Sequence, residues 1–404
     1  MKFRFRPPLQ TMERGNRNVL SVLLIGFIAV FSARAAPGFP VGTALLGPVL
    51  AVDTVEQDRI VLFDIGNGAQ RELSFGNRWH RVWGFSPDGC RLLFTLSDGI
   101  APAKLYSARL DGSDFRALVS YPALPDNQWG VWEPQWSPNA ADPRIAFTFI
   151  STENGEMEHL IGWVSPQGGE PAFYSVSGNE HTARWSPDGQ WLVYVSYEER
   201  LPGADIFSTA EPTPTGGSST NVVPLSEADL WIVSADGATK YRLTNFPTGS
   251  VSMPRWSPDG FLIGFVFSPS PNNDQFWMIG NAPDALPTQL SYAWSLILDL
   301  TWLPDSTAMI AAARDIQGIT ENRLWRIPLV GNADVDASLY LDDPALSHAD
   351  YARFSADGRW LALRSAYELV VIDQEDGSTT MFDWIGNTPP VWSPAGFQGE
   401  GQCA

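Results

Sequence analysis

The sequence predicts an all-β protein built from repeated units of four short strands. Three observations lead to this expectation: the composition, a turn motif that recurs along the chain, and the apolar segments that follow each copy of the motif. The 404 residues include 35 Gly and 32 Pro, which favour many tight turns and few long helices. The 17 Trp residues need a large interior or a binding surface.

The recurring motif is an aromatic residue followed by a Ser-Pro-Asp-Gly turn or a close variant of it, as at 185–189 and 256–260. Pro presets φ, Asp caps the turn and Gly accepts a positive φ, so each copy predicts a hairpin between two strands. We call the aromatic residue that opens each copy the anchor residue and expect it to pack between neighbouring units. The anchor residues are Phe85, Trp136, Trp185, Trp256, Trp302, Phe354 and Trp392.

The spacing of the anchor residues predicts a β-propeller. Successive intervals are 51, 49, 71, 46, 52 and 38 residues, and most match the ~40–50 residues of one four-stranded blade. Three predicted strands at 48–52, 59–64 and 70–73 precede Phe85 without an anchor residue of their own. We therefore expect a strand near Trp392 to complete this N-terminal blade, which closes the ring and gives seven blades. Six blades, with a degenerate copy at Trp392, is the alternative.

The longest interval contains a polar segment rich in Pro, Gly and Ser, from Glu211 to Asn221. Such a composition without periodicity predicts a loop. It falls between the second and third strands of its blade. We interpret it as a tolerated surface insertion, with a lid over one face as the alternative.

The N-terminus has the pattern of an export signal. A basic stretch leads into the apolar run Val19–Phe31, and Ala33 and Ala35 fit a cleavage site. This run is shorter than the ~20 residues of a membrane-spanning helix. We expect a signal peptide at 1–35, a linker at 36–44, the propeller at 45–397 and a tail at 398–404, in the periplasm or outside the cell. An uncleaved signal anchor is the alternative.

Charge excludes two classes of partner. The formal net charge is −19, and without the first 35 residues 20 basic and 44 acidic residues remain. Such an acidic body repels the phosphates of nucleic acids and the surface of anionic membranes. We expect neither of these as a partner, and no membrane span after signal cleavage.

Cysteine is rare, with Cys90 and Cys403 as the two residues of this type. A disulfide framework therefore does not hold the fold together. Cys90 follows one predicted turn and Cys403 follows the turn near Trp392, on neighbouring blades, so a bridge that ties down the C-terminal tail is feasible in an oxidising compartment. Two free thiols are the alternative.

The repeats of a Trp-Ser-Pro-Asp-Gly turn and an apolar strand, from about residue 45 to 396, resemble the WD40-like repeats of TolB-type β-propellers. Similar repeats occur in the propeller domains of prolyl-oligopeptidase-like enzymes. The resemblance implies the fold and leaves the function open. The α/β domain of TolB has no counterpart here, so docking to a Tol-system partner is not carried over. No Gly-x-Ser-x-Gly nucleophile elbow is present, so we expect no serine-hydrolase activity.

Polar and aromatic residues cluster just before several anchor residues, where the innermost strand of a blade reaches the mouth of the central channel. We predict that they bind a ligand there. These candidates are His80, Arg81, Trp132, Glu133, Glu180, His181, Asp299, His348, Asp350 and Tyr351. A sharper hypothesis is that His181, with Glu133, Asp299 or Asp350, binds a divalent metal. The simpler interpretation is that polar side chains at a water-filled channel are solvated.

These observations favour an exported, non-enzymatic propeller, monomeric and without a cofactor, that binds a protein partner or a small polar ligand at its channel face. The alternative is a metal-dependent lyase or hydrolase that acts on carbohydrate, with Glu180 or Asp350 as the base. This alternative rests only on a resemblance to seven-bladed polysaccharide lyases.

Overall fold

The computed structural model describes residues 44–153, 156–174, 178–198, 227–292, 294–314, 321–366, 368–383, 386 and 388–403. The predicted signal peptide, the linker up to residue 43 and the loop 211–221 lie outside these residues. In the parts that are described, no helix has the length and apolar character needed to cross a membrane.

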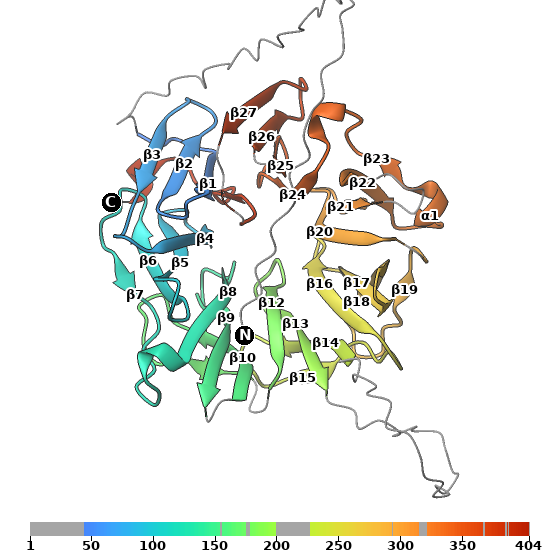
Figure 1. Ribbon diagram of the computed structural model, residues 1–404, viewed down its shortest axis with the longest axis horizontal. Coiled ribbons are helices and arrows are strands. Elements are labelled where there is room, and N and C mark those ends of the chain that lie inside the picture. The colour runs from blue at the N-terminus through green and yellow to red at the C-terminus, as the bar shows by residue number, and fades with distance from the viewer. Residues whose placement is uncertain are drawn as a thin grey trace, which may run out of the picture. The chain divides into compact units, whose positions relative to one another are not determined.

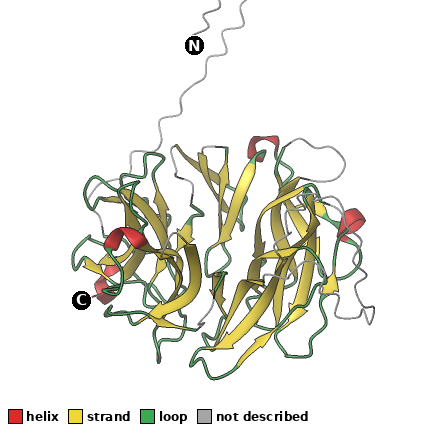
Figure 2. Ribbon diagram, turned by 60° about the horizontal axis from the view of Figure 1, so that its bottom comes forward, coloured by secondary structure: helices red, strands yellow, loops and turns green. Residues whose placement is uncertain are grey.

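The described residues form an all-β propeller, in which antiparallel sheets follow one another around a central axis (Figure 1). Within them, five sheets have four strands and one has eight. Helical segments are short and few, as Figure 2 shows. They are α1 (Ala333–Asp336) and 3-10 turns at Asp126–Gln128, Pro344–Leu346 and Glu400–Cys403.

The strands of the first three sheets come from the N-terminal part of the chain, apart from one C-terminal strand. The first sheet contains β28 (Val391–Trp392), β1 (Val49–Asp53), β2 (Ile60–Asp64) and β3 (Gln70–Leu73). The second contains β4 (Trp79–Phe85), β5 (Arg91–Ser97), β6 (Lys104–Arg109) and β7 (Arg116–Ala117). The third contains β8 (Trp129–Trp136), β9 (Ile145–Glu153), β10 (Glu156–Val164) and β11 (Ala172–Phe173).

The larger sheet and two further sheets complete the ring. The larger sheet contains β12 (Glu180–Trp185), β13 (Trp191–Glu198), β14 (Glu227–Ser234), β15 (Lys240–Arg242), β16 (Ser250–Trp256), β17 (Leu262–Ser270), β18 (Asn273–Gly280) and β19 (Thr288–Gln289). The next contains β20 (Leu296–Trp302), β21 (Ala308–Arg314), β22 (Arg323–Pro328) and β23 (Ser338–Leu339). The last contains β24 (Ala349–Phe354), β25 (Trp360–Ser365), β26 (Glu368–Asp373) and β27 (Thr379–Asp383).

The ring closes through the C-terminal strand, as the sequence predicts. β28 pairs antiparallel with β1, so that Trp392 lies opposite Leu50 and Val391 opposite Ala51. Ser393 strengthens the junction, because its hydroxyl accepts a hydrogen bond from the Val49 amide at 3.0 Å and its own amide donates to the Val49 carbonyl at 2.8 Å. The edge of β1 that an open ring would expose is thereby covered.

The number of sheets differs from the prediction. Seven separate blades are predicted, and the described residues form six sheets, one of them with eight strands. A parallel bridge between Ala228 in β14 and Ser250 in β16 joins two groups of four strands into the eight-stranded sheet. The bridge joins the third strand of one unit to the first strand of the next, where the two backbones approach closely enough to pair.

The anchor residues pack between neighbouring sheets, as expected. Trp185, Trp256 and Trp302 are buried. The indole N–H of Trp256 donates to the backbone carbonyl of Arg184 in β12 at 3.0 Å, and that of Trp302 donates to Arg255 in β16 at 2.9 Å. Trp392 donates in the same way to Arg353 in β24 at 2.9 Å. Each of these tryptophans therefore ties its own strand to the innermost strand of the preceding unit.

The C-terminal segment is fixed to the first two sheets by a disulfide between Cys90 and Cys403. This resolves the alternative left open by the sequence in favour of a bridge. Nearby, the side chain of Glu400 accepts a hydrogen bond from the Leu45 amide at 3.1 Å and forms an ion pair with Arg71 in β3. The Phe397 ring is buried against Gly89, which has a φ of +74°.

Candidate functional site: an arginine-lined cavity

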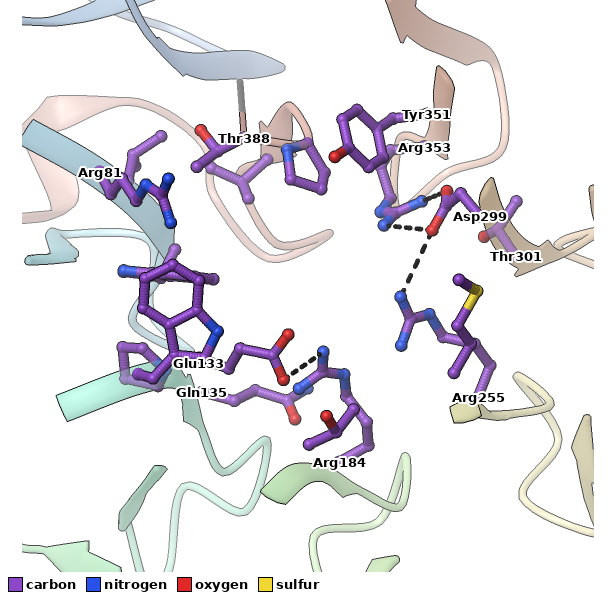
Figure 3. Close-up of a pocket in the computed structure, with 18 of the residues that line it drawn as sticks. Arg81, Glu133, Gln135, Arg184, Arg255, Asp299, Thr301, Tyr351, Arg353 and Thr388 are labelled. Carbon is purple, nitrogen blue, oxygen red and sulfur yellow. Dashed lines mark hydrogen bonds and ion pairs between the residues drawn. The ribbon is translucent and has the colours of Figure 1, made fainter. Parts of the chain in front are cut away.

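The innermost strands enclose a cavity of about 790 Å³, which we call the central cavity. Every sheet contributes to its wall, through β4, β8, β12, β16, β20, β24 and the segment that leads into β28. Figure 3 shows the labelled side chains around it, with arginines on several sides. Four arginines line the cavity among the described residues: Arg81, Arg184, Arg255 and Arg353.

The repeat itself places three of these arginines. Side chains alternate along a strand, so when an anchor residue packs into the core, the residue before it points to the other side. Arg184, Arg255 and Arg353 each directly precede an anchor residue and line the central cavity. The hydrogen bond that each of their carbonyls accepts from the next tryptophan fixes the backbone from which the guanidinium extends.

Bulges shape the wall of the cavity. The pairing of β8, β12 and β16 with their neighbours shifts register two or three residues before the anchor residue. At these shifts Glu133, Thr182 and Met253 have φ values of +48°, +59° and +54°. Positive φ is uncommon for residues other than glycine, and bulges redirect side chains near functional sites. The equivalent bulge in successive units therefore turns one side chain per strand into the cavity.

Two carboxylates on the wall are paired with arginines. Arg184 contacts Glu133 at 3.2 Å, and Asp299 accepts from Arg353 at 3.1 Å and from Arg255 at 3.4 Å. Asp299 is buried. Burial opposes ionisation of Glu133, but the charges of Arg184 and Arg255 outweigh this effect, and the pKa of Glu133 is lowered. Both carboxylates thus serve as counter-ions in the wall.

Arg255 interacts with two other cations of the wall, Arg184 and Arg353. Burial, together with repulsion from Arg184 and Arg353, lowers its pKa to about 10, although Asp299 and Glu133 act in the opposite direction. The group still carries its charge at neutral pH. Its Nε donates to the Leu300 carbonyl at 3.1 Å, so backbone and carboxylate together hold the guanidinium in place.

Arg81 differs from the other three arginines. Its side chain forms no hydrogen bond or ion pair with any residue that the structure describes, and its guanidinium lies over the Trp132 ring at 4.5 Å from the centroid. Trp132 in turn meets Trp83 edge to face, with ring centroids 5.6 Å apart. A stacked guanidinium keeps its N–H groups free in its own plane. Arg81 therefore faces the central cavity with its donors available.

The structure brings half of the predicted site residues to the central cavity. Those that line it are Arg81, Trp132, Glu133, Asp299 and Tyr351. Those that do not are His80, Glu180, His181, His348 and Asp350. All five of the second group precede their anchor residue by four to six positions. Arg81 and Trp132 also precede theirs by four positions and line the cavity, so the distance from the anchor residue does not by itself decide which side chains reach it.

The histidines have local partners instead. His80 is fully buried, and its Nε2 accepts a hydrogen bond from the Phe75 amide at 2.9 Å. Burial lowers the pKa of His80 and of His181. The Nδ1 of His181 lies 2.7 Å from the Thr182 hydroxyl, and His348 is exposed next to Ser347.

The two remaining carboxylates are also engaged elsewhere. Buried Glu180 forms an ion pair with Lys240 at 3.4 Å, and Asp350 accepts from Arg364 at 2.9 Å. In the described part of the chain, no group of three His, Cys, Asp or Glu side chains is arranged to hold a metal ion. The donor set of the metal hypothesis, His181 with Glu133, Asp299 or Asp350, is therefore not assembled.

Sequence reasoning missed several residues of the cavity wall. They are Gln135, Arg184, Arg255, Thr301 and Arg353. A signal for them was present, since each directly precedes an anchor residue, and three of the seven copies have arginine there. Because side chains alternate along a strand, the residue directly before a buried anchor residue is predicted to point away from the core and toward the cavity.

Comparison with known proteins gives relatives for part of the chain. No protein-family model matches it. The uncharacterized peptidase YuxL of Bacillus subtilis is 24% identical over 254 residues, which cover 62% of this chain and 30% of that protein. An uncharacterized protein of Agrobacterium fabrum is 26% identical over 148 residues, which cover 34% of this chain and 47% of that protein. The matches thus span less than half the length of these relatives.

Solved structures share the architecture over most of the chain. A puromycin hydrolase has a TM-score of 0.57 at 15% identity, covering 87% of this chain and 55% of that one. Oligogalacturonate lyase from Vibrio parahaemolyticus has a TM-score of 0.52 at 14% identity, covering 89% and 90%. TolB from Acinetobacter baumannii is also similar, with a TM-score of 0.46 at 15% identity, covering 88% and 68%. At these identities the likeness extends to the fold alone, and the fold of this chain is the β-propeller.

Proposed function

We propose that this protein is an exported seven-bladed propeller that binds a small anionic ligand in its central cavity without catalysing a reaction on it. The charge of the wall carries the proposal. Four guanidinium groups face two carboxylates there, an excess of two positive charges in a chain whose net charge is −19. A concave site with low-dielectric walls and charge of one sign concentrates ligands of the opposite sign.

Arg81 is the group that we assign to the ligand. Each of the other three arginines already binds a carboxylate and a backbone carbonyl, so part of its donor set is occupied, and it supplies positive potential to the cavity. Arg81 has no such partner among the described residues, and a guanidinium matches a carboxylate or phosphate in a bidentate geometry.

The non-enzymatic part of the proposal rests on the carboxylates. A general base needs an available carboxylate with a pKa near the working pH. Glu133 and Asp299 are held by arginines, and the pKa of Glu133 is lowered. Glu133 is therefore not suited to accept a proton from a ligand at neutral pH, and the Asp299 carboxylate is occupied by two arginines.

Seven blades and export are supported by separate observations. The eight-stranded sheet divides into two groups of four strands at the bridge between Ala228 and Ser250, and each group has its own anchor residue. Export is supported by the N-terminal sequence pattern and by the bridge between Cys90 and Cys403, since disulfides persist in oxidising compartments.

The test uses acetate as the simplest carboxylate probe. Its binding to the full chain is followed by saturation-transfer NMR at constant ionic strength, for the wild type and for Arg81→Gln. We expect Arg81→Gln to weaken acetate binding about tenfold or more, because one charge-assisted bidentate contact is lost. The matched control is Arg326→Gln, since Arg326 lies in β22 outside the cavity and also has no ion pair within the described residues.

Two results would overturn the proposal. The first is the absence of saturation transfer to acetate with the wild-type protein. The second is acetate binding that Arg81→Gln leaves unchanged. Equal losses in Arg81→Gln and Arg326→Gln count as the second result, because they report the net charge of the protein rather than the cavity.

A further inference from the structure

A second cavity of about 320 Å³ adjoins the central cavity, and we call it the side cleft. It lies between β4, the start of β8 and the loop that joins β5 to β6. Arg81 and Trp132 line both cavities, so the side cleft opens beside the guanidinium assigned to the anion. Its other walls include Trp79, Pro102, Val131 and Ile150.

The side cleft offers apolar contact and few free polar groups. The Thr95 hydroxyl on its wall accepts a hydrogen bond from the Trp83 indole at 3.0 Å. The Ser97 hydroxyl donates to the Ala101 carbonyl at 2.9 Å and accepts from the Gly99 amide at 3.0 Å. A sugar ring needs partners for several hydroxyls. Apart from these two engaged side chains, the Gln57 amide and the tryptophan N–H groups are the uncharged polar side-chain groups that the lining offers. The lining therefore favours a group without hydroxyls.

Close contacts hold the walls of the side cleft in position. Gly99 has a φ of +82°, and a Cβ atom there would lie 3.2 Å from the Trp79 ring. At Gly130 a Cβ atom would lie 2.5 Å from the Cβ of Pro102. The loop between β5 and β6 is thus packed against Trp79 on one side and against β8 on the other, which shapes the side cleft before any ligand arrives.

Two tryptophans at the side cleft leave much of their surface in water. The exposed fractions are 55% for Trp79 and 38% for Trp132, whereas four anchor tryptophans are buried, Trp136, Trp185, Trp256 and Trp302. Burying such aromatic surface against a ligand is favourable. The two exposed rings lie in the same cleft as the Arg81 guanidinium.

We propose that the ligand of the central cavity is a carboxylate that carries an aromatic ring, with the ring in the side cleft between Trp79 and Trp132. This inference rests on the proposed function, because Arg81 must bind the carboxylate for the ring to reach the side cleft. Because Arg81 and Trp132 stand in the walls of both cavities, one ligand with an anionic and an apolar part can contact both.

The experiment compares three probes that share one carboxylate: acetate, phenylacetate and glucuronate. We expect phenylacetate to bind the wild-type protein about 10- to 100-fold more tightly than acetate, the gain that burial of a phenyl group gives. Glucuronate should bind no more than a few fold more tightly than acetate. All three affinities are measured on the full chain by NMR titration.

Variants locate the gain in the side cleft. Trp79→Ala should bind acetate like the wild type and lose most of the phenylacetate gain, while Trp79→Phe should keep part of it. Phe261→Ala removes an aromatic side chain that is 72% exposed and lines neither cavity, and it should keep the full gain. Thermal melting of each variant establishes that it is folded before its affinities are compared.

The outcomes separate this inference from the proposed function. If acetate does not bind at all, the proposed function fails and this inference fails with it. If acetate binds but phenylacetate gains nothing, or the gain survives in Trp79→Ala, this inference alone is overturned. A gain for glucuronate equal to that for phenylacetate would show that the side cleft takes a sugar ring, and would also overturn it.

Discussion

The two sides of the central cavity hold their arginines in different ways. On the side built by β12, β16, β20 and β24, Arg184, Arg255 and Arg353 each contact a carboxylate and a backbone carbonyl. On the side built by β4 and β8, Arg81 lies over Trp132 without an ion pair to any described residue. We call these the paired side and the open side.

This difference gives two roles to arginines that the sequence alone does not distinguish. A partly buried guanidinium costs free energy unless its donors are satisfied, and breaking such a pair is expensive. The paired side therefore contributes shape and positive potential, and the open side contributes a cation that a ligand can reach. The predictions below test this division.

The largest effect is expected on the paired side. Asp299→Asn removes the charge that Arg255 and Arg353 share and leaves two guanidinium groups without a counter-ion. We expect a loss of roughly 3 kcal/mol in the free energy of unfolding, the lower end of what broken buried ion pairs cost. Urea denaturation of the wild type and the variant measures it.

The matched change on the open side is Arg81→Gln, which breaks no ion pair within the described residues. Its free energy of unfolding should stay within about 1 kcal/mol of the wild type, the range of most substitutions away from buried networks. Similar losses in both variants would contradict the division into a paired and an open side.

The fold was largely predictable because its signals are local and repeated. Each hairpin is specified by a turn of four residues, and Trp392 has the same turn chemistry as the other anchor residues, which led to the closure of the ring by β28. Signals of this kind do not report contacts between units. The bridge between Ala228 and Ser250 depends on how closely the third strand of one unit approaches the first strand of the next, and the sequence carries no mark of it.

The site was half predictable for a related reason. Distance before the anchor residue identified Glu133 and Asp299, which line the central cavity, but also His80 and His181, which do not. Positions four before the anchor residue divide in the same way, since Arg81 lines the cavity and His181 does not. The bulge with a positive φ at Glu133 has no glycine to mark it. The identity of the unpaired arginine depends on side-chain packing, which a single sequence does not reveal.

A smaller effect, dependent on pH, is expected near the open side. Asp53 ends β1 and is buried, and its Oδ1 accepts from the Thr388 hydroxyl while its Oδ2 has no hydrogen-bond partner among the described residues. Burial raises the pKa of Asp53 from 3.8 to about 6, although the Thr388 hydrogen bond and the charge of Arg81 oppose the rise.

This shift fixes the sign of a pH dependence. Between pH 3.8 and about 6 the folded protein binds a proton at Asp53 that the unfolded chain does not. The contribution of Asp53 to the free energy of unfolding therefore falls as the pH rises through this window, and it is constant above it. From pH 4 to pH 7, Asp53→Asn should therefore gain stability relative to the wild type by about 2 kcal/mol. Parallel curves of unfolding free energy against pH would contradict this. In an Arg81→Gln background the window should extend to higher pH, because the opposing charge is gone.

The smallest effect concerns how the paired side is held in place. Trp302 donates from its indole N–H to the Arg255 carbonyl at 2.9 Å, whereas the indole N–H of Trp185, an equally buried anchor residue, has no partner among the described residues. Substitution by Phe removes the same atoms at both positions but a hydrogen bond at Trp302 alone. We expect Trp302→Phe to lose about 1 kcal/mol more in unfolding free energy than Trp185→Phe. Equal losses would mean that the anchor residues act through packing alone, and that the position of Arg255 is set by its ion pair with Asp299.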